Sequence, residues 1–260
     1  MTIDRDLDRT TPDANRRHWQ AVAAGGEVPP WQELGAEPTG IVATRIDDPP
    51  GLWLQPAGGD TSAAVLAVHG GGFVGGSALT HARLFGHLAL AAGVPVFAMD
   101  YGLVPEHVFP SQLEQTAHAY RWLRARVPRV ALAGDSCGAL LALGLALQAE
   151  DRDAAPRALF LMSPWTDLDA AGASYDHGTD PFFTRDVVRS LADAYLAGAY
   201  RHDLRTAPLD ADLRDLPPTL VQAGGDEALL DDAVALARRL GLAGVDVRLD
   251  IGPASCTRSR

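Results

Sequence analysis

The sequence predicts an α/β fold in which helices cover both faces of one mostly parallel sheet. From residue 51 onward, short apolar segments typical of buried strands alternate with longer segments of helical periodicity. Parallel strands need a crossover between them, so this alternation places helices on both faces. A length of 260 residues is enough for one such domain with a well-buried core.

Seven segments are predicted to be strands, because each is a short apolar run bounded by turn residues. The first run ends at the turn Gly58-Gly59-Asp60, and the second leads into a glycine-rich loop. The last run alternates polar and apolar residues, as a strand with one exposed face does. In chain order the predicted strands are 52–55, 64–68, 94–99, 130–133, 158–162, 219–223 and 246–251.

The helices are predicted from longer segments that start and stop at characteristic residues. Gly93 closes the first helix after the glycine-rich loop. In the next helix, Ser111 followed by Glu114 predicts a capping box, and Asp231 and Asp232 are expected to cap the last helix. The predicted helices are 13–24, 80–92, 111–125, 139–149, 184–197 and 231–242.

Two irregular stretches interrupt this scaffold. Ligands of such sheets bind outside the carboxyl ends of the strands, so both stretches are expected to form a cap there. The chain is therefore divided into cap segments at 1–45 and 163–205 and core segments at 46–162 and 206–260.

Composition and charge narrow the classes of function. The net charge of −11 disfavours nucleic acids and anionic membrane surfaces as partners. No apolar run is long enough to span a bilayer, and the acidic N-terminus lacks a signal-peptide pattern. Cys137 and Cys256 do not indicate a disulfide framework, so we expect a cytoplasmic protein. No His/Cys cluster has metal-ligand spacing, and the sequence indicates neither a cofactor nor an oligomeric state.

The segment Gly134-Asp135-Ser136-Cys137-Gly138 predicts a nucleophile elbow. It follows a strand and precedes a helix, which is the context that a G-x-S-x-G motif requires. The two glycines permit the tight turn, Ser136 is the exposed nucleophile, and the Cys137 N–H is an oxyanion donor. The alternatives are a chance match in a glycine-rich chain and a Cys137 thiol nucleophile, whose side chain would point away from the exposed apex.

The tetrad His69-Gly70-Gly71-Gly72 supplies the complementary half of an acyl-transfer site. It ends a buried strand and offers unshielded N–H groups to the oxygen that becomes negative when a serine attacks an ester. A simple mobile turn is the alternative, which the nearby pair Gly75-Gly76 supports. His69 is expected to anchor this loop rather than to act in catalysis.

Asp226 is predicted to be the acid that orients a histidine base. It follows the strand at 219–223 and comes after Ser136 in the chain. The alternative is that it caps the next helix, a role that Asp231 and Asp232 fit better.

With these motifs in place, the chain resembles the hormone-sensitive-lipase-like esterases, which are α/β-hydrolases with an HGGG loop. The resemblance rests on HGGGFVGGS, DYGLVPEHVFP, GDSCGALLAL, SPWTDL, DPFFT and QAGGDEALLDDA. It implies the α/β-hydrolase fold with a helical cap, Ser136 as nucleophile, and Asp226 as triad acid. It also implies an oxyanion hole formed by the N–H groups of Gly71, Gly72 and Cys137, with His69 and Gly70 supporting the loop. The implied substrates are esters of short or medium acyl chains, or lactones, and no cofactor is implied.

Three departures qualify this resemblance. Gly102 stands where the family usually has arginine, and Ala139 stands where it usually has a second glycine. The third is the absence of a histidine after His202, so the triad base is missing from its expected place near residues 252–260. We therefore expect a C-terminally truncated or frameshifted family member with impaired catalysis.

Other readings of the missing base stay open. A different histidine could act as base, and the chain could instead be a non-catalytic small-molecule-binding protein or a decayed, inactive product. The alternative base candidates are His81, His87, His107, His118, His177 and His202.

Overall fold

Strands and helices alternate through the part of the chain that the computed structural model describes, residues 17, 36–149, 155–176, 180 and 183–253. The strands are β1 Ile41–Asp47, β2 Pro50–Pro56, β3 Ala63–Val68, β4 Val96–Met99, β5 Arg129–Asp135, β6 Leu159–Met162, β7 Thr219–Gly224 and β8 Val247–Gly252. The helices are α3 Ala82–Ala92, α4 Ser111–Arg124, α5 Cys137–Leu147, α6 Arg185–Leu196, α7 Leu230–Leu242 and the short 3-10 helix η1 Ala173–Asp176.

The strands form one eight-stranded sheet in the order β1-β2-β4-β3-β5-β6-β7-β8. The pairs from β4 to β8 are parallel, whereas β2 is antiparallel to both β1 and β4. This confirms the predicted mostly parallel α/β sheet. Parallel neighbours end at the same edge, so the loops after β3, β5, β6 and β7 meet there.

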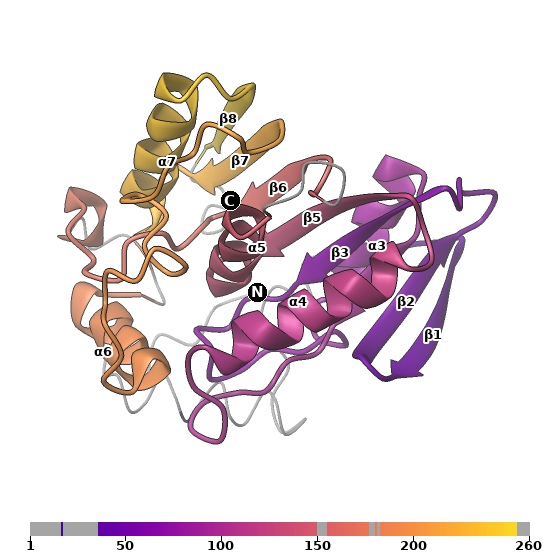
Figure 1. Cartoon of the computed structure of the whole chain (residues 1–260), viewed down its shortest axis with the longest axis horizontal. Helices are drawn as coiled ribbons and strands as arrows, with labels where there is room; N and C mark the ends of the chain where they lie inside the picture. Colours follow the sequence, from indigo (N-terminus) through magenta and orange to yellow (C-terminus); the bar gives the residue numbers. More distant parts are fainter. Residues whose placement is uncertain (1–16, 18–35, 150–154, 177–179, 181–182, 254–260) are drawn as a thin grey trace, which may run out of the picture.

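Helices lie on both faces of the sheet (Figure 1). On one face, α4, α5 and α7 pack over β3 to β8, and α3 packs on the other face against β1, β2 and β4. Two apolar clusters of buried side chains correspond to these two interfaces. On the α3 side of the strands β6 and β7, the side chains of Phe160, Met162 and Leu220 are only partly buried.

The sequence missed β1 and misjudged the start of α4. The β1 strand carries mostly exposed side chains, so its sequence lacks a buried apolar run. At α4, Pro110 precedes the helix and no side chain caps it, so the predicted capping box is wrong. The Ser111 hydroxyl instead accepts a hydrogen bond from Gln115 Nε2 at 2.9 Å.

The cap segments are described in part. Except for Arg17, the predicted helix at 13–24 and the rest of residues 1–35 lie outside the described residues. Because β1 pairs within the sheet, the proposed N-terminal cap segment ends before Ile41 rather than at residue 45. In the second segment, α6 lies apart from the helices that cover the sheet (Figure 1). None of the described helices is long and apolar enough to cross a membrane.

Candidate active site

Ser136 occupies a sharp turn between β5 and α5. Its backbone has φ 53° and ψ −121°, a conformation that a non-glycine residue adopts only under tertiary constraint. The Ser136 N–H donates to the Met162 carbonyl at 2.9 Å, which ties the turn to β6. A side chain at Gly134 would come within 2.5 Å of the backbone carbon of Gly138, so the turn requires glycine there. This strand–turn–helix geometry is that of a G-x-S-x-G motif, and the Ser136 side chain is partly buried there.

The glycine-rich loop lies directly against this turn. The Gly70 N–H donates to Asp135 Oδ1 at 2.9 Å, which joins the loop to the residue before Ser136. Gly71 and Gly72 both have positive φ, at 119° and 61°. The strand register brings Val68 beside Gly134, so the two predicted motifs begin next to each other. The glycine-rich loop and the serine turn therefore adjoin each other at the ends of β3 and β5.

His69 is buried and serves the structure of the loop. Its Nδ1 lies 2.7 Å from the Gly70 carbonyl oxygen, and its ring stacks on Tyr101 with centroids 4.1 Å apart. The Tyr101 hydroxyl donates to the His69 carbonyl at 2.8 Å. Burial, followed by the neighbouring His81, lowers the pKa of His69 to about 3, so its imidazole is neutral at physiological pH.

Cys137 is a poor alternative to the serine nucleophile. Its side chain is fully buried, and burial raises the pKa of the thiol to about 12. A nucleophilic cysteine must be a thiolate, which this environment suppresses. The sulfur instead lies 3.6 Å from the Tyr101 hydroxyl, inside the core behind the loop.

An aromatic stack holds the end of the oxyanion loop. Phe73 has φ 63°, which is rare outside glycine, and its ring stacks on Tyr195 of α6 with centroids 3.7 Å apart. Gly72 faces the same helix, because a Cβ there would lie 2.9 Å from Leu191 Cδ1. The helix α6 therefore packs against the end of this loop.

The Tyr195 hydroxyl is buried and has no hydrogen-bond partner among the described residues. We expect Tyr195→Phe to stabilise the protein by about 1 kcal/mol, because an unsatisfied buried hydroxyl is costly. Tyr101→Phe is the matched control, and it should destabilise by about 1 kcal/mol because it removes a formed hydrogen bond. Urea unfolding of both variants measures the change in the free energy of unfolding. Changes of the same sign in the two variants would contradict the unsatisfied state of the Tyr195 hydroxyl.

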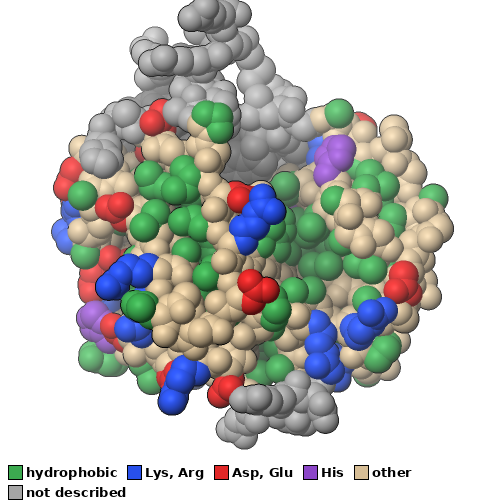
Figure 2. All heavy atoms as spheres, turned by 90° about the horizontal axis from the view of Figure 1, so that it is seen from above, with side chains coloured by type: hydrophobic (Ala, Val, Ile, Leu, Met, Phe, Trp, Pro, Cys, Tyr) green, Lys and Arg blue, Asp and Glu red, His purple; other side chains and the backbone are tan. Residues whose placement is uncertain are grey.

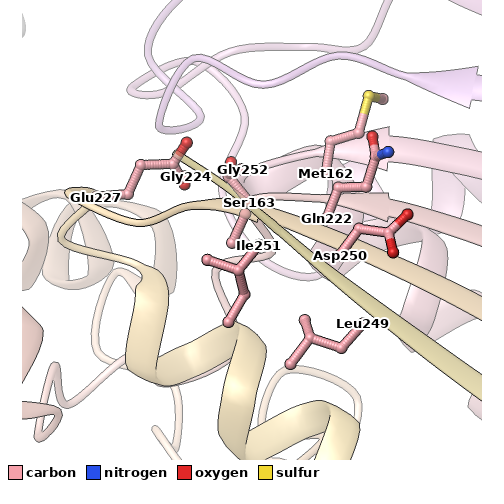
Figure 3. A pocket seen from close by; sticks show the side chains of 10 residues that line it. Met162, Ser163, Gln222, Gly224, Glu227, Leu249, Asp250, Ile251 and Gly252 are labelled. Atoms are coloured by element: carbon pink, nitrogen blue, oxygen red, sulfur yellow. The ribbon is translucent and has the colours of Figure 1, made fainter. Parts of the chain in front are cut away.

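An open cavity of about 670 Å³ lies at the carboxyl ends of β6, β7 and β8. Figure 3 shows the side chains of Met162, Gln222 and Asp250 on one side of the β8 ribbon, those of Leu249 and Ile251 on the other, and Glu227 to the left. The cavity is lined by Met162, Ser163, Gln222, Ala223, Gly224, Glu227, Leu249, Asp250, Ile251 and Gly252.

Glu227, rather than the predicted Asp226, is the carboxylate that faces this cavity. Asp226 is exposed, whereas Glu227 is partly buried and its Oε2 has no hydrogen-bond partner among the described residues. Burial raises the pKa of Glu227 and nearby Asp180 adds to this, while hydrogen bonds with Ser163 and Gly224 oppose it. A buried carboxylate oxygen without a donor favours a ligand that brings an N–H. The sequence signal was the acidic pair itself, which does not say which member turns inward.

The expected capping role of Asp231 and Asp232 is wrong. Leu229 precedes α7 without a side-chain cap. Asp231 instead accepts the N–H of Ser174 at 2.9 Å, and Asp232 accepts the N–H of Thr166 at 2.8 Å. Further donors to Asp232 are the Asp167 N–H at 2.8 Å and the Tyr175 hydroxyl at 3.0 Å. The two aspartates therefore tie the start of the second cap segment to the core.

Burial raises the pKa of Asp232 to about 7, although three donors oppose this. The pKa of this carboxyl in the folded protein exceeds its ordinary value of 3.8. Its contribution to the stability of the folded state is therefore largest below pH 4 and is lost as the pH rises to 7. Between pH 4 and pH 7, the free energy of unfolding of Asp232→Asn should therefore rise relative to that of the unsubstituted protein. The rise should be at most about 1.4 kcal/mol per pH unit. Urea unfolding at several pH values checks this, and a pH-independent difference would contradict it.

Each described histidine has a ring nitrogen engaged with a group other than Ser136. His18 and His177 lie outside the described residues. Within the described part of the chain, none of the histidines considered as alternative bases is therefore in contact with Ser136. The partners are the Gly70 carbonyl for His69, Asp135 for His81, the Ala36 carbonyl for His87, Ser111 for His107, Asp48 for His118, and Asp169 and Asp210 for His202.

The other departures from the family have local explanations. A Cβ at Gly102 would overlap the ring of His107, so this loop has no room for an arginine side chain. The Gly102 N–H donates to Gln115 Oε1 at 2.9 Å. Ala139 is fully buried in α5, where its methyl group joins the core.

No group of three or more possible metal ligands occurs among the described residues. Arginine side chains on the face in Figure 2 are scattered among acidic and apolar ones rather than gathered into a basic area.

Comparison with known proteins shows the family. The family described as alpha/beta hydrolase fold matches residues 65–255. A crystal structure of an esterase from the bacterial hormone-sensitive lipase family has a TM-score of 0.80 and 35% identity, over 98% of this chain and 90% of that one. The chain belongs to the hormone-sensitive-lipase group of α/β-hydrolases. The hormone-sensitive-lipase homologue EstE7, from a metagenome library, has a TM-score of 0.81 and 30% identity, over 98% and 89%.

Curated relatives of this α/β-hydrolase are named as esterases. An acetyl-hydrolase of Streptomyces hygroscopicus is 41% identical over 210 residues, which are 77% of this chain and 69% of the relative. The carboxylesterase/phospholipase LipF of Mycobacterium tuberculosis is 39% identical over 202 residues, which are 73% of this chain. The chain covers 54% of LipF, so it spans about half of that relative's length.

Proposed function

We propose that this α/β-hydrolase is a serine carboxylic-ester hydrolase that acts through an acyl-enzyme. The observation that carries the proposal is Ser136 in a strained turn, directly beside the HGGG loop. Ser136 Oγ attacks the ester carbonyl, and the N–H groups of Gly71, Gly72 and Cys137 stabilise the oxyanion. The alcohol leaves, and water then releases the acid. Acetyl and other short acyl groups are the proposed substrates, in line with the relative named acetyl-hydrolase, and lactones are the alternative.

We propose Glu227 as the carboxylate that orients the base, with Asp226 as the alternative. Glu227 lines the cavity and has a buried oxygen without a partner, whereas Asp226 is exposed. A buried carboxylate holds the imidazole of a triad in position. A serine triad that lacks its histidine is slower than a complete one by roughly 10⁴ to 10⁶-fold, so hydrolysis without a base at Ser136 is proposed to be slow.

The test is covalent labelling of Ser136 by a fluorophosphonate, together with hydrolysis of p-nitrophenyl butyrate. In labelling, Ser136 Oγ bonds to phosphorus, fluoride leaves, and the serine proton passes to water. We expect the unsubstituted protein to be labelled and to hydrolyse the ester slowly. Ser136→Ala should abolish both the labelling and the hydrolysis. Absence of both in a cooperatively folded protein would contradict the esterase assignment.

A non-catalytic small-molecule-binding protein is the second candidate. It is favoured by the open cavity at the carboxyl ends of β6, β7 and β8, which is large enough for a small molecule. Cooperative unfolding without Ser136-dependent labelling would support it, whereas the absence of cooperative unfolding would support a decayed product.

A further inference from the structure

We infer that Asp135 and His81 form a positioning pair that holds the oxyanion loop, residues 69–72, against the nucleophile turn. The inference rests on the proposed esterase function, because it concerns the geometry of the oxyanion hole. Neither residue touches the reacting atoms, so both act through Gly70 and its neighbours.

Asp135 stands at the junction of the two motifs. It is the last residue of β5 and precedes Ser136, so its backbone is part of the nucleophile turn. Its Oδ1 accepts the Gly70 N–H at 2.9 Å. A Cβ at Gly70 would overlap its carboxylate, so the loop backbone lies directly on this side chain. The orientation of the next two peptides, Gly71 and Gly72, follows from this contact.

The second oxygen of the same carboxylate is held from the opposite side. Asp135 Oδ2 lies 3.3 Å from Nε2 of His81, whose side chain is only 2% exposed. The other ring nitrogen of His81 lies 2.9 Å from Thr80 Oγ1 and 3.3 Å from the Ser77 carbonyl oxygen. His81 directly precedes α3, so the pair connects the loop, the nucleophile turn and this helix.

The contact with His81 keeps the Asp135 carboxylate charged, which strengthens its hydrogen bond with the Gly70 N–H. Burial alone would raise the pKa of Asp135, but the charge and hydrogen bond of His81, together with His69 and the Gly70 N–H, outweigh burial and lower the pKa. A charged acceptor binds a backbone N–H more strongly than a neutral one does. The Asp135 side chain points to the α3 face, because it shares a face with Ala133 and Met162. Its charge is therefore directed away from α5.

The test compares Asp135→Ala with Asp135→Asn, because asparagine retains an oxygen for the Gly70 N–H and an N–H for a neutral imidazole. Asp135→Ala should slow fluorophosphonate labelling of Ser136 by about 10-fold to 100-fold, since small misplacements of catalytic groups have effects of this size. Asp135→Asn should slow labelling by no more than about threefold, because it keeps the contact with the Gly70 N–H and loses only the added strength that the charge supplies. His81→Ala should also slow the labelling of Ser136, as Asp135→Ala does.

A matched control separates positioning from general loss of stability. Leu240 is fully buried in α7, away from both motifs, so Leu240→Ala should lower the melting temperature but leave the labelling rate unchanged. Hydrogen exchange of the amides at 69–72 gives a second readout. It should accelerate in Asp135→Ala and stay near the unsubstituted rate in Asp135→Asn.

Equal labelling rates in Asp135→Ala and the unsubstituted protein would overturn the inference, as would failure of Asp135→Asn to restore the rate. If the unsubstituted protein is neither labelled nor active on p-nitrophenyl butyrate, the proposed esterase function fails. The exchange measurement then decides the inference by itself: unchanged exchange in Asp135→Ala overturns it, and accelerated exchange supports it.

Discussion

Gly138→Ala is expected to destabilise the protein by about 3–5 kcal/mol. Gly138 lies in the first turn of α5, where a Cβ would overlap the carbonyl oxygen of Val68 and lie 2.6 Å from that of His69. Both obstacles are backbone atoms of β3 and the loop after it, so no side-chain movement can relieve the overlap. Since domains are stable by only about 5–15 kcal/mol, the substitution should remove a large part of the free energy of unfolding.

Gly241→Ala is the matched control, because Gly241 also lies in a helix. A Cβ there would meet only Val247 Cγ1, at the ordinary distance of 3.7 Å. This variant should gain about 0.5 kcal/mol from the better helix propensity of alanine. Urea unfolding of both proteins measures the difference. Similar stabilities for the two variants would show that α5 can shift away from β3 without cost.

The sequence predicted what depends on local chemistry. Apolar runs identified seven of the eight strands, and glycines on both sides of Ser136 located the nucleophile turn. These features are predictable because burial and tight turns restrict which residues fit. The β1 strand escaped prediction because its side chains are mostly exposed, so its conformation depends on pairing with β2 rather than on burial.

Features that depend on contacts between distant segments were not predictable. Asp231 and Asp232 matched a helix-start pattern, but their carboxylates bind the cap segment 57 to 66 residues earlier in the chain. The choice between Asp226 and Glu227 depends on which side chain turns toward the cavity, and adjacent positions look alike in sequence. Likewise, the roles of Asp135 and His81 appear only when α3 and β5 are brought together.

Imidazole at millimolar concentrations is expected to accelerate Ser136-dependent hydrolysis of p-nitrophenyl butyrate about tenfold or more. A positioned general base contributes roughly 10²–10⁴-fold, and free imidazole can recover part of this in an open cavity. Glu227 Oε2 is buried there without a donor, so it should accept the imidazole N–H. The rate is measured against imidazole concentration, with Ser136→Ala subtracting the uncatalysed reaction of imidazole with the ester.

The carboxylate variants then distinguish the two candidate acids. Glu227→Gln should reduce the imidazole-dependent acceleration at least tenfold, because a neutral amide stabilises imidazolium poorly. Asp226→Asn is the matched control and should retain the acceleration. The opposite result would restore Asp226 as the acid, and a lack of acceleration in all proteins would show that the cavity does not deliver a base to Ser136.

The hydrogen bond between Gly70 and Asp135 also bears on how the protein folds. It joins residues 65 positions apart, and contacts of this separation form only after costly loop closure. β3 and β5 must pair before it can form, so a growing polypeptide holds both motifs before it holds an oxyanion hole. During refolding, the reactivity of Ser136 should therefore appear only when β3 and β5 have paired. The time course of its labelling should report when this step of folding occurs.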